Sequence, residues 1–208
     1  DLQHRGLGVY FNYQSPVAKF EALRLNLPGK YNTENATAAI SVAVALGCGE
    51  AQIRKGLETF TGIKRRFDIR HRTDQVVYID DYAHHPTEIE AVVAAVRSML
   101  PQHKMVVAFQ PHLYSRTNDF HKEFAAALSK PDAVVLLDIY PAREKPMEGV
   151  SSDMVFDLMT TPEKSRCTLA DLPDAIKKYK SKPVAVLTLG AGNIDTQIEN
   201  TRQLVARW

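Results

Sequence analysis

The sequence lacks the features of several common classes of protein. Its most apolar run, residues 36–48, is far shorter than the roughly 20 residues that a membrane-spanning helix needs, and the amino terminus lacks the charged-then-apolar layout of a signal peptide. With 26 basic and 24 acidic residues the net charge is only +2, so the sequence lacks the strong positive charge that would indicate binding to nucleic acid. Cys48 and Cys167 have no metal-ligand spacing, which favours a reduced cytosolic protein. We therefore expect a cytoplasmic protein that binds neither nucleic acid nor membranes.

The sequence also lacks the two common phosphate-binding loops. No G-x-x-x-x-G-K-[ST] occurs, because Gly29-Lys30 is followed by Tyr31. The turn 190–192, Gly-Ala-Gly, resembles the start of a dinucleotide fingerprint, but Asp195 stands where the third glycine belongs, and too little chain follows for the acidic ribose ligand. We interpret this stretch as a tight turn leading into a helix, which argues against a nicotinamide-dependent oxidoreductase.

From residue 76 onward, short apolar runs alternate with polar loops and amphipathic segments. Such runs are typical of parallel strands covered on both faces. The expected strands are 76–80, 104–109, 133–140 and 184–189. One helix is expected to begin at Pro86, a second after the cap candidates 117–119, and a last one after Gly192. Two further helices are expected at 154–159 and 172–179. This pattern predicts an α/β fold with a Rossmann-like doubly wound, mostly parallel sheet.

The first sixty residues differ from this pattern. We expect strands at 8–13 and 20–27 and helices at 32–46 and 51–60, with a joint at 61–63. A piece of this size buries only about 60% of its surface and is marginal alone. We therefore predict two domains, with residues 1–63 as the end of a larger domain and residues 64–208 as the α/β domain.

Four polar loops follow the expected parallel strands. They are 81–85, 110–117, 141–150 and 190–193. Because parallel strands share one direction, these loops gather at the carboxyl edge of the sheet, where such folds bind ligands. Two of the loops are rich in histidine and charged residues, so a site at this edge is the favoured interpretation.

Each candidate residue in these loops has a structural alternative. Asp80 or Asp81 could cap the loop, and Arg116 could be a solvated surface residue, although beside His112 it favours an anion site. A zinc site is disfavoured, because adjacent histidines diverge and no further ligand has the right spacing.

Two asparagines and a basic cluster outside these loops also have a structural and a functional interpretation. Asn32 and Asn35 lie one turn apart on an expected helix, although asparagine is a poor helix former. Their side-chain amides suit the edge of adenine, and capping explains Asn32 equally well. The basic cluster 64–66 could be solvated surface or could hold a phosphate.

Taken together, the motifs resemble those of the Mur ligase family. They are LPGKYNTENATAA, GIKRRFD, DDYAHHPTE, FQPHLYSRT, LDIYPAREKP and GAGNID, and they occur in the family's order over nearly the whole chain. DDYAHHPTE with FQPHLYSRT is highly specific, whereas GAGNID alone is not. The resemblance implies the family's C-terminal domain, preceded by the end of its central ATPase domain.

The resemblance also implies an activity. Mur ligases of peptidoglycan synthesis join an amino acid to a nucleotide-linked carboxylate, and these motifs favour the branch that joins L-alanine to UDP-N-acetylmuramate. ATP with Mg²⁺ phosphorylates the carboxylate, and the amine then displaces the phosphate. Because the phosphate loop and the UDP-binding domain are absent, we expect a fragment that is inactive alone and lacks most metal ligands.

Residue roles follow only from the resemblance. Asn32 and Asn35 match asparagines near adenine, and Arg66 matches an arginine near ATP. Asp81 and Tyr82 match residues that help to close the nucleotide site.

For the amino acid, His84, His112 and Arg116 match the wall that receives L-alanine. The implied catalytic set is Arg66, Asp81 and His84.

Three positions depart from the family's motifs. Tyr31 stands where the family usually has histidine, Ala83 replaces a common glycine, and Leu113 replaces an arginine, which leaves Arg116 as the arginine of its loop.

Two other functions stay open. A recycling ligase for murein tripeptide shares DD[FY]AHHP but usually differs at FQPHLYSRT. A nucleotide-binding module without catalysis would also fit the missing phosphate loop.

Overall fold

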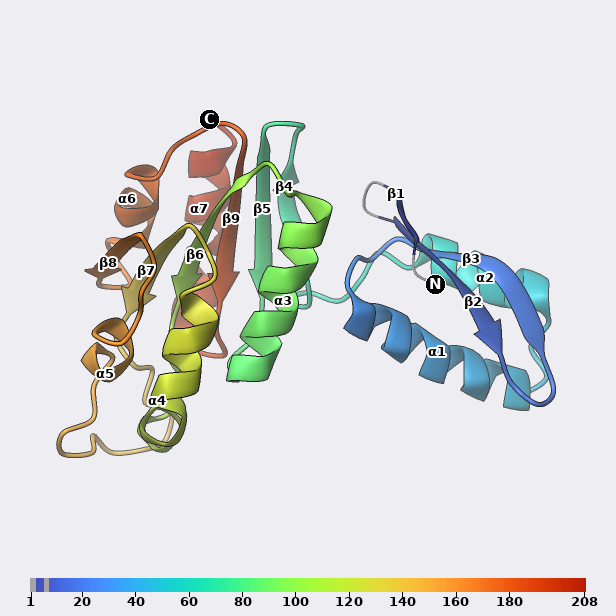
Figure 1. Ribbon diagram of the computed structural model, residues 1–208, viewed down its shortest axis with the longest axis horizontal. Coiled ribbons are helices and arrows are strands. Elements are labelled where there is room, and N and C mark those ends of the chain that lie inside the picture. Colours follow the sequence, from blue (N-terminus) through green and yellow to red (C-terminus); the bar gives the residue numbers. More distant parts are fainter. Residues whose placement is uncertain (1–2, 6–7) are drawn as a thin grey trace. The chain divides into compact units, whose positions relative to one another are not determined.

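A computed structural model describes residues 3–5 and 8–208 (Figure 1). The chain divides into two compact units, Asp1–Gly62 with Ala94–Met99 and Ile63–Val93 with Leu100–Trp208. Within the described residues, no helix is both long and apolar enough to cross a membrane.

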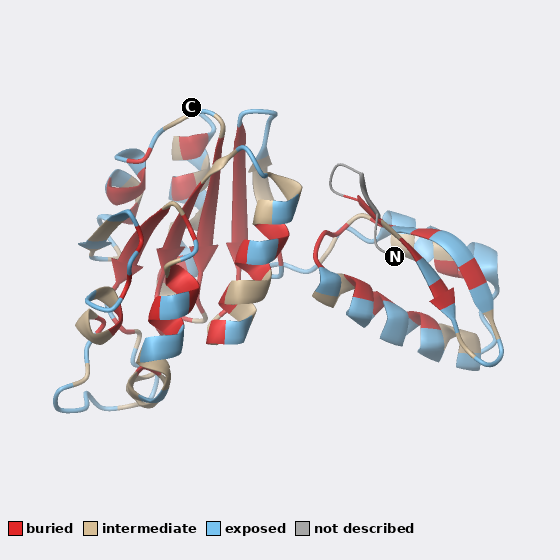
Figure 2. Ribbon diagram, in the orientation of Figure 1, coloured by how far each residue is buried: buried red, intermediate tan, exposed pale blue. Residues whose placement is uncertain are grey.

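The second unit is built on a six-stranded sheet. Its strands, in spatial order, are β4 (Asp68–Arg72), β5 (Val76–Asp81), β9 (Val184–Leu189), β6 (Lys104–Phe109), β7 (Ala133–Leu137) and β8 (Glu163–Cys167). β4 pairs antiparallel with β5, and the other neighbours are parallel. Every residue of β5, β7 and β9 is buried, as Figure 2 shows in red, which explains why these strands lack polar alternation.

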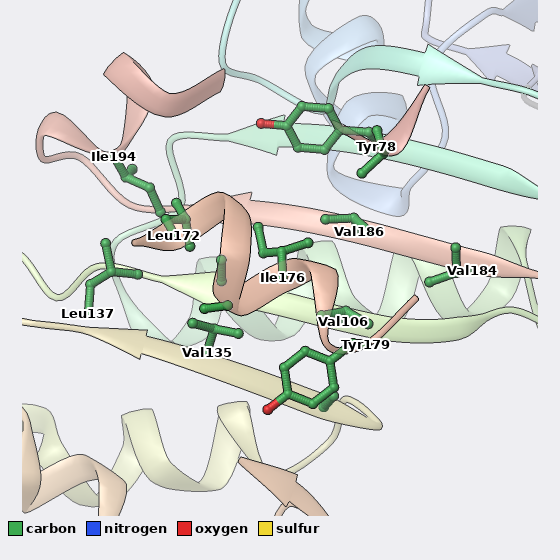
Figure 3. Packing of buried hydrophobic residues seen from close by; sticks show 14 of the residues in the cluster. Tyr78, Val106, Val135, Leu137, Leu172, Ile176, Tyr179, Val184, Val186 and Ile194 are labelled. Carbon is green, nitrogen blue, oxygen red and sulfur yellow. The ribbon is translucent and has the colours of Figure 1, made fainter. Parts of the chain in front are cut away.

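Helices cover both faces of this sheet (Figure 1). α3 (Pro86–Met99) and α4 (Tyr114–Leu128) lie on one face, and α6 (Leu172–Lys177) and α7 (Ile198–Val205) on the other. Short α5 (Asp153–Phe156) and the 3₁₀ segment η1 (Asn193–Gln197) complete the unit. Figure 3 shows Leu172 and Ile176 of α6 packed over Val106, Val135 and Val186 of the sheet.

The antiparallel strand β4 brings an additional segment to the carboxyl edge. Asp68 pairs with Asp80, so the start of β4 lies at the carboxyl end of β5. The segment that precedes β4, including Arg65 and Arg66, therefore reaches the same edge as the loops that follow the parallel strands.

The first unit has a smaller antiparallel sheet of β1 (Gln3–Arg5), β2 (Gly8–Gln14) and β3 (Lys19–Leu25). Its helices are α1 (Lys30–Ala45) and α2 (Glu50–Thr59), and its core includes Phe11, Leu23 and Ile40. Only Thr33, Ala36 and Ile40 of α1 are buried, while Val42 is 60% exposed. Much of α1 is therefore exposed rather than packed on the core of the first unit.

The predicted fold class and the four apolar strands are confirmed, and the helix expected to begin at Pro86 buries Ile89, Val92, Val93 and Val96. Three predicted boundaries are wrong by three residues or more, and one of them is the end of α5, which lies at Phe156 rather than at residue 159. The third strand ends at Leu137, three residues early, and α4 begins at Tyr114 rather than after 117–119. Leu113, with φ 73°, precedes the helix, and Thr117 already lies in the first turn with its hydroxyl on the Leu113 carbonyl.

Strands β1, β4 and β8 were not predicted. β4 and β8 are the edges of the six-stranded sheet, and their sequences DIRHR and EKSRC contain no apolar run. Edge strands are commonly charged, because charge disfavours pairing with another chain. Their identity as strands therefore depends on pairing with neighbours rather than on a local apolar pattern.

Candidate functional site

The carboxyl edge of the six-stranded sheet holds two groups of polar side chains. The arginine–aspartate cluster consists of Arg65, Arg66, Asp80, Asp81 and Tyr82. The histidine cluster consists of His84, His112, Arg116, Tyr140 and Glu144.

Asp81 ends β5 and is 4% exposed. Its Oδ2 accepts a hydrogen bond from the Phe67 amide at 2.6 Å, and its Oδ1 accepts one from the Ala83 amide at 2.8 Å. Burial raises the pKa of this carboxyl to about 6, although both amides and Arg66 favour the charged form. Asp81 therefore fixes two backbone segments around one buried carboxyl group.

Asp80 is fully buried beside it. Thr188 Oγ1 donates to Oδ1 at 2.7 Å, and Arg65 Nε donates to Oδ2 at 3.2 Å. Burial raises the pKa of Asp80, and these two partners oppose that effect. Asp80 thus links β5 to β9 and to the segment before β4.

Arg66 differs from its neighbour Arg65 in that it is exposed. Its guanidinium carbon lies 5.6 Å from the centre of the Tyr82 ring. Within residues 8–208 it makes no salt bridge, so its donors remain available to a bound anion.

His84 is held by the turn that opens α3. Its Nδ1 lies 2.9 Å from the Tyr82 carbonyl oxygen, and its amide donates to Glu88 Oε2 at 2.9 Å. A carbonyl only accepts, so Nδ1 carries the proton and Nε2 of the neutral ring is a free acceptor. His85 diverges as expected, with its ring 4.8 Å from that of Phe120.

His112 lies opposite, with its ring centre 6.0 Å from that of His84. Arg116 Nη1 lies 3.3 Å from His112 Nδ1, so this nitrogen accepts and Nε2 of the neutral ring carries the proton. Burial lowers the pKa of His112, and the positive charge of Arg116 lowers it further. The neutral His84 ring therefore keeps a free acceptor and the neutral His112 ring a free donor, with the two ring centres 6.0 Å apart.

Tyr140 and Glu144 fix the far side of this cluster. The Tyr140 ring stacks on His112 at 5.8 Å, and Tyr140 exchanges backbone hydrogen bonds with the Pro111–Leu113 segment. Glu144 accepts hydrogen bonds from the Ser115 amide at 3.0 Å and hydroxyl at 2.5 Å, which lower its pKa. Its carboxylate thus caps the first turn of α4, which carries Arg116.

The turn after β9 is locked to the loop after β6. Gln110 Oε1 accepts from the Ile194 amide at 2.9 Å, and its Nε2 donates to Asn193 Oδ1 at 2.8 Å. A Cβ on Gly192 would lie 2.4 Å from Gln110 Oε1 and 2.7 Å from Tyr140 Cβ. Glycine is therefore required here by close packing rather than by phosphate binding.

Asn32 and Asn35 belong to the first unit. Gly29 is the N-cap of α1, so Asn32 does not cap the helix; its amide donates instead to the Pro28 carbonyl at 2.6 Å. Asn35 is exposed. For metal binding, no group of three His, Cys, Asp or Glu residues among those described could hold an ion.

Comparison with known proteins identifies the family. The pattern described as "Mur ligase, glutamate ligase domain" matches residues 65–192, more than half of the chain. The chain belongs to the Mur ligase family.

Its curated relatives agree. The chain is 43% identical over 199 residues to UDP-N-acetylmuramate–L-alanine ligase of Parabacteroides distasonis and 45% identical over 195 residues to that of Flavobacterium johnsoniae. These matches cover 96% and 94% of this chain but 43% of each relative. The chain therefore spans less than half the length of these Mur ligases.

Solved structures show the same fold. UDP-N-acetylmuramate–alanine ligase of Thermotoga maritima matches with a TM-score of 0.80 and 28% identity, over 97% of this chain and 44% of that one. A murein peptide ligase of Psychrobacter arcticus matches with a TM-score of 0.62 at 18% identity, over 98% of this chain and 42% of that one. The second likeness supports the fold alone.

Sequence reasoning missed several residues of the Mur ligase edge. Glu88 was given no role, although it lies three residues after His85 at the start of a helix, where a glutamate can accept from backbone amides. Gln110, Tyr140 and Glu144 lie inside quoted motifs without an assigned role. Arg65 was treated only as part of the basic cluster 64–66, because its backbone conformation and its partners are not visible in the sequence.

Proposed function

We propose that this chain is part of an ATP-dependent ligase that joins L-alanine to UDP-N-acetylmuramate in peptidoglycan synthesis, in the cytoplasm. The observation that carries the proposal is its 41–45% identity, over 91–98% of its length, to relatives named for that reaction. The histidine cluster supports it, because the paired imidazoles and an arginine suit an amino acid.

The proposed reaction has two steps. A carboxylate oxygen of UDP-N-acetylmuramate attacks the γ-phosphorus of ATP, which forms an acyl phosphate and releases ADP. The amino nitrogen of L-alanine then attacks the acyl carbon, phosphate leaves, and the nitrogen loses a proton. The amine must therefore be neutral when it attacks.

The arginine–aspartate cluster is assigned to the nucleotide. Arg66 is exposed and unpaired within residues 8–208, so its planar fork can contact a phosphate. Asp81 holds the backbone on either side, and Tyr82 supplies a ring beside the nucleotide. Asn32 and Asn35 are assigned to the adenine edge. Mg²⁺ would offset phosphate charge, and since the described residues offer no metal cluster, we assign it no ligand here.

The histidine cluster is assigned to L-alanine. The free Nε2 of His84 accepts a hydrogen bond from an N–H of the neutral amino group. The lone pair of the amino nitrogen then stays available for attack. The Nε2–H of His112 donates to an oxygen of the amino acid. Arg116 recognises the carboxylate, a role that the aliphatic Leu113 cannot share.

Arg116 provides the direct test. In the protein encoded by the complete reading frame that contains residues 1–208, Arg116→Ala should lower kcat/KM for alanine by about 10- to 150-fold, since a charge-assisted hydrogen bond contributes roughly 1.5–3 kcal/mol. Arg116→Lys should recover part of this loss, because a point charge cannot reproduce a fork.

The matched control is Lys122→Ala, which removes an exposed cation from the same helix. It should leave all three substrates unaffected, and Arg116→Ala should leave KM for ATP and the sugar nucleotide nearly unchanged. Steady-state kinetics with each substrate varied in turn measure this. A loss within about twofold for alanine, under roughly 0.5 kcal/mol, would remove Arg116 from the amino-acid site.

A second test concerns the chain by itself. Residues 1–208 contain no G-x-x-x-x-G-K-[ST] loop, so we expect no ligase activity and weak binding of Mg-ATP. Titration calorimetry measures this affinity. A dissociation constant in the low micromolar range would show that the nucleotide site is complete within this chain.

A further inference from the structure

The two adjacent arginines of the arginine–aspartate cluster differ in backbone conformation. Arg65 has φ 60° and Phe67 has φ 50°, which non-glycine residues rarely adopt. This conformation lets the Arg65 carbonyl accept from the Tyr82 amide at 2.7 Å, while the Phe67 amide reaches Asp81 at 2.6 Å. Strain of this kind persists only where surrounding contacts hold it.

The Arg65 side chain supplies those contacts. Its Nε donates to Asp80 Oδ2 at 3.2 Å, its Nη2 donates to the Gly190 carbonyl at 2.5 Å, and its Nη1 lies 3.4 Å from Asp195 Oδ2. These three acceptors belong to the end of β5, the turn after β9, and η1. The side chain is only 18% exposed, so its fork is committed within the protein.

Tyr82 lies against both arginines. The Arg65 guanidinium carbon is 5.0 Å from the Tyr82 ring centre, and that of Arg66 is 5.6 Å from it. Tyr82 is therefore held by Arg65 through both its ring and its amide. The ring in turn forms one wall beside the exposed Arg66.

We propose that Arg65 is a positioning residue: it ties the ends of β5 and β9 together and holds Tyr82, and through Tyr82 it sets the place of the Arg66 guanidinium. The contacts alone support the positioning of residues 65–67 and Tyr82 by the Arg65 side chain. Its effect on the contact between Arg66 and a phosphate rests on the proposed function. The two consequences are tested separately.

The first experiment uses the 208-residue chain and needs no ligand. Hydrogen exchange followed by NMR compares Arg65→Asn with Arg66→Gln; asparagine tolerates a positive φ, so the first change removes mainly the guanidinium. Arg65→Asn should speed exchange of the Tyr82 and Gly190 amides by about tenfold or more, with the Val186 and Leu187 amides of β9 unchanged. Arg66→Gln should leave all four within about twofold.

Equal exchange at Tyr82 and Gly190 in both variants would overturn the proposal. If Arg65→Asn lowers the protection of amides throughout the sheet, the measurement is repeated with Arg65→Lys. Lysine keeps a positive charge beside Asp80 but lacks the guanidinium fork. Selective loss at Tyr82 and Gly190 is again required, and uniform loss or none contradicts the positioning role.

The second experiment is a double-mutant cycle in the protein from the complete reading frame. Arg66→Gln should lower kcat/KM for ATP by about 10- to 150-fold. If Arg65 acts through Arg66, the double variant Arg65→Asn/Arg66→Gln should have a kcat/KM for ATP no lower than that of the weaker single variant, within about threefold. Losses that multiply would overturn the coupling. A normal Arg66→Gln enzyme would instead refute the nucleotide assignment and leave the exchange result standing.

Discussion

The two clusters at the carboxyl edge contain similar residue types but use them differently. In the arginine–aspartate cluster, Asp80 and Asp81 are 0% and 4% exposed, and their oxygens are occupied by protein donors. In the histidine cluster, His112 and Arg116 are half-buried. The imidazole rings of His84 and His112 each have one nitrogen that no protein group occupies among the described residues. Buried charges here build the frame, and the partly exposed ones are those that we propose to contact ligands.

This difference has a measurable consequence for stability. Trp208, the single tryptophan of the sequence, packs against the core of the second unit. Its fluorescence therefore reports the unfolding of that unit in the 208-residue chain. Changes in the buried frame should shift this transition strongly, and changes in the ligand-facing groups should shift it weakly.

Asp80→Ala should have the largest effect. It removes the buried carboxylate that accepts from both Arg65 Nε and the Thr188 hydroxyl, and breaking a buried pair costs roughly 3–5 kcal/mol of unfolding free energy. Arg66→Ala, the exposed control, should change it by less than about 0.5 kcal/mol. Urea unfolding followed by Trp208 fluorescence measures both. Similar costs for the two variants would abolish the proposed distinction.

Asp81 should make stability depend on pH. Its pKa is raised from 3.8 to about 6 in the folded state, so the folded chain holds an additional proton between these values. The stabilising contribution is complete below pH 3.8 and is lost as pH rises through 6, by up to about 3 kcal/mol. Asp81→Asn removes this titration, so its cost should be larger at pH 4 than at pH 7. A cost that is equal at both values would show that burial does not control this carboxyl.

Gly192→Ala tests the packing between the two loops. The added Cβ meets Gln110 Oε1 and Tyr140 Cβ, and overpacking of this kind costs about 1–3 kcal/mol. Because Tyr140 stacks on His112, the imidazole NMR signals of His112 should also move. At Gly149, where nothing lies within 4 Å of the added Cβ but φ is 76°, alanine should cost roughly 1–2 kcal/mol and leave His112 unmoved. An unmoved His112 in Gly192→Ala would separate the turn from the histidine cluster.

These effects also show which parts of the molecule the sequence could predict. Strands β5 and β9 were found because two-sided burial produces apolar runs, and the direction that β5 shares with β6 placed His84, His112 and Arg116 at one edge. Local pattern was sufficient for these elements because every residue in them meets the same environment.

The roles of Arg65 and Glu144 could not be found in this way. Strand β4 is short, charged and antiparallel, so nothing local indicated that Arg65 reaches the edge beside Asp80. Glu144 contacts Ser115 across 29 residues in an otherwise exposed loop. Such contacts arise from the tertiary arrangement, and residue type and spacing do not encode them.

The smallest expected effect on stability distinguishes the two charges beside His112. Arg116→Ala should change the unfolding free energy by less than about 0.5 kcal/mol, because the residue belongs to the ligand-facing group. It should nevertheless raise the pKa of His112, since the positive charge of Arg116 disfavours the imidazolium. Glu144→Gln should act in the opposite direction, because the Glu144 carboxylate favours the imidazolium and its loss lowers the pKa further.

Titration of the His112 ring signals by NMR measures both shifts in the 208-residue chain. Burial is the largest cause of the lowered pKa and is common to the two variants, so the sign of each change isolates the charge that was removed. Shifts of the same sign would mean that both substitutions act by opening the cluster to water. Opposite signs would show that Arg116 and Glu144 act on the pKa of His112 through their charges, in addition to the burial that lowers it and favours the neutral imidazole.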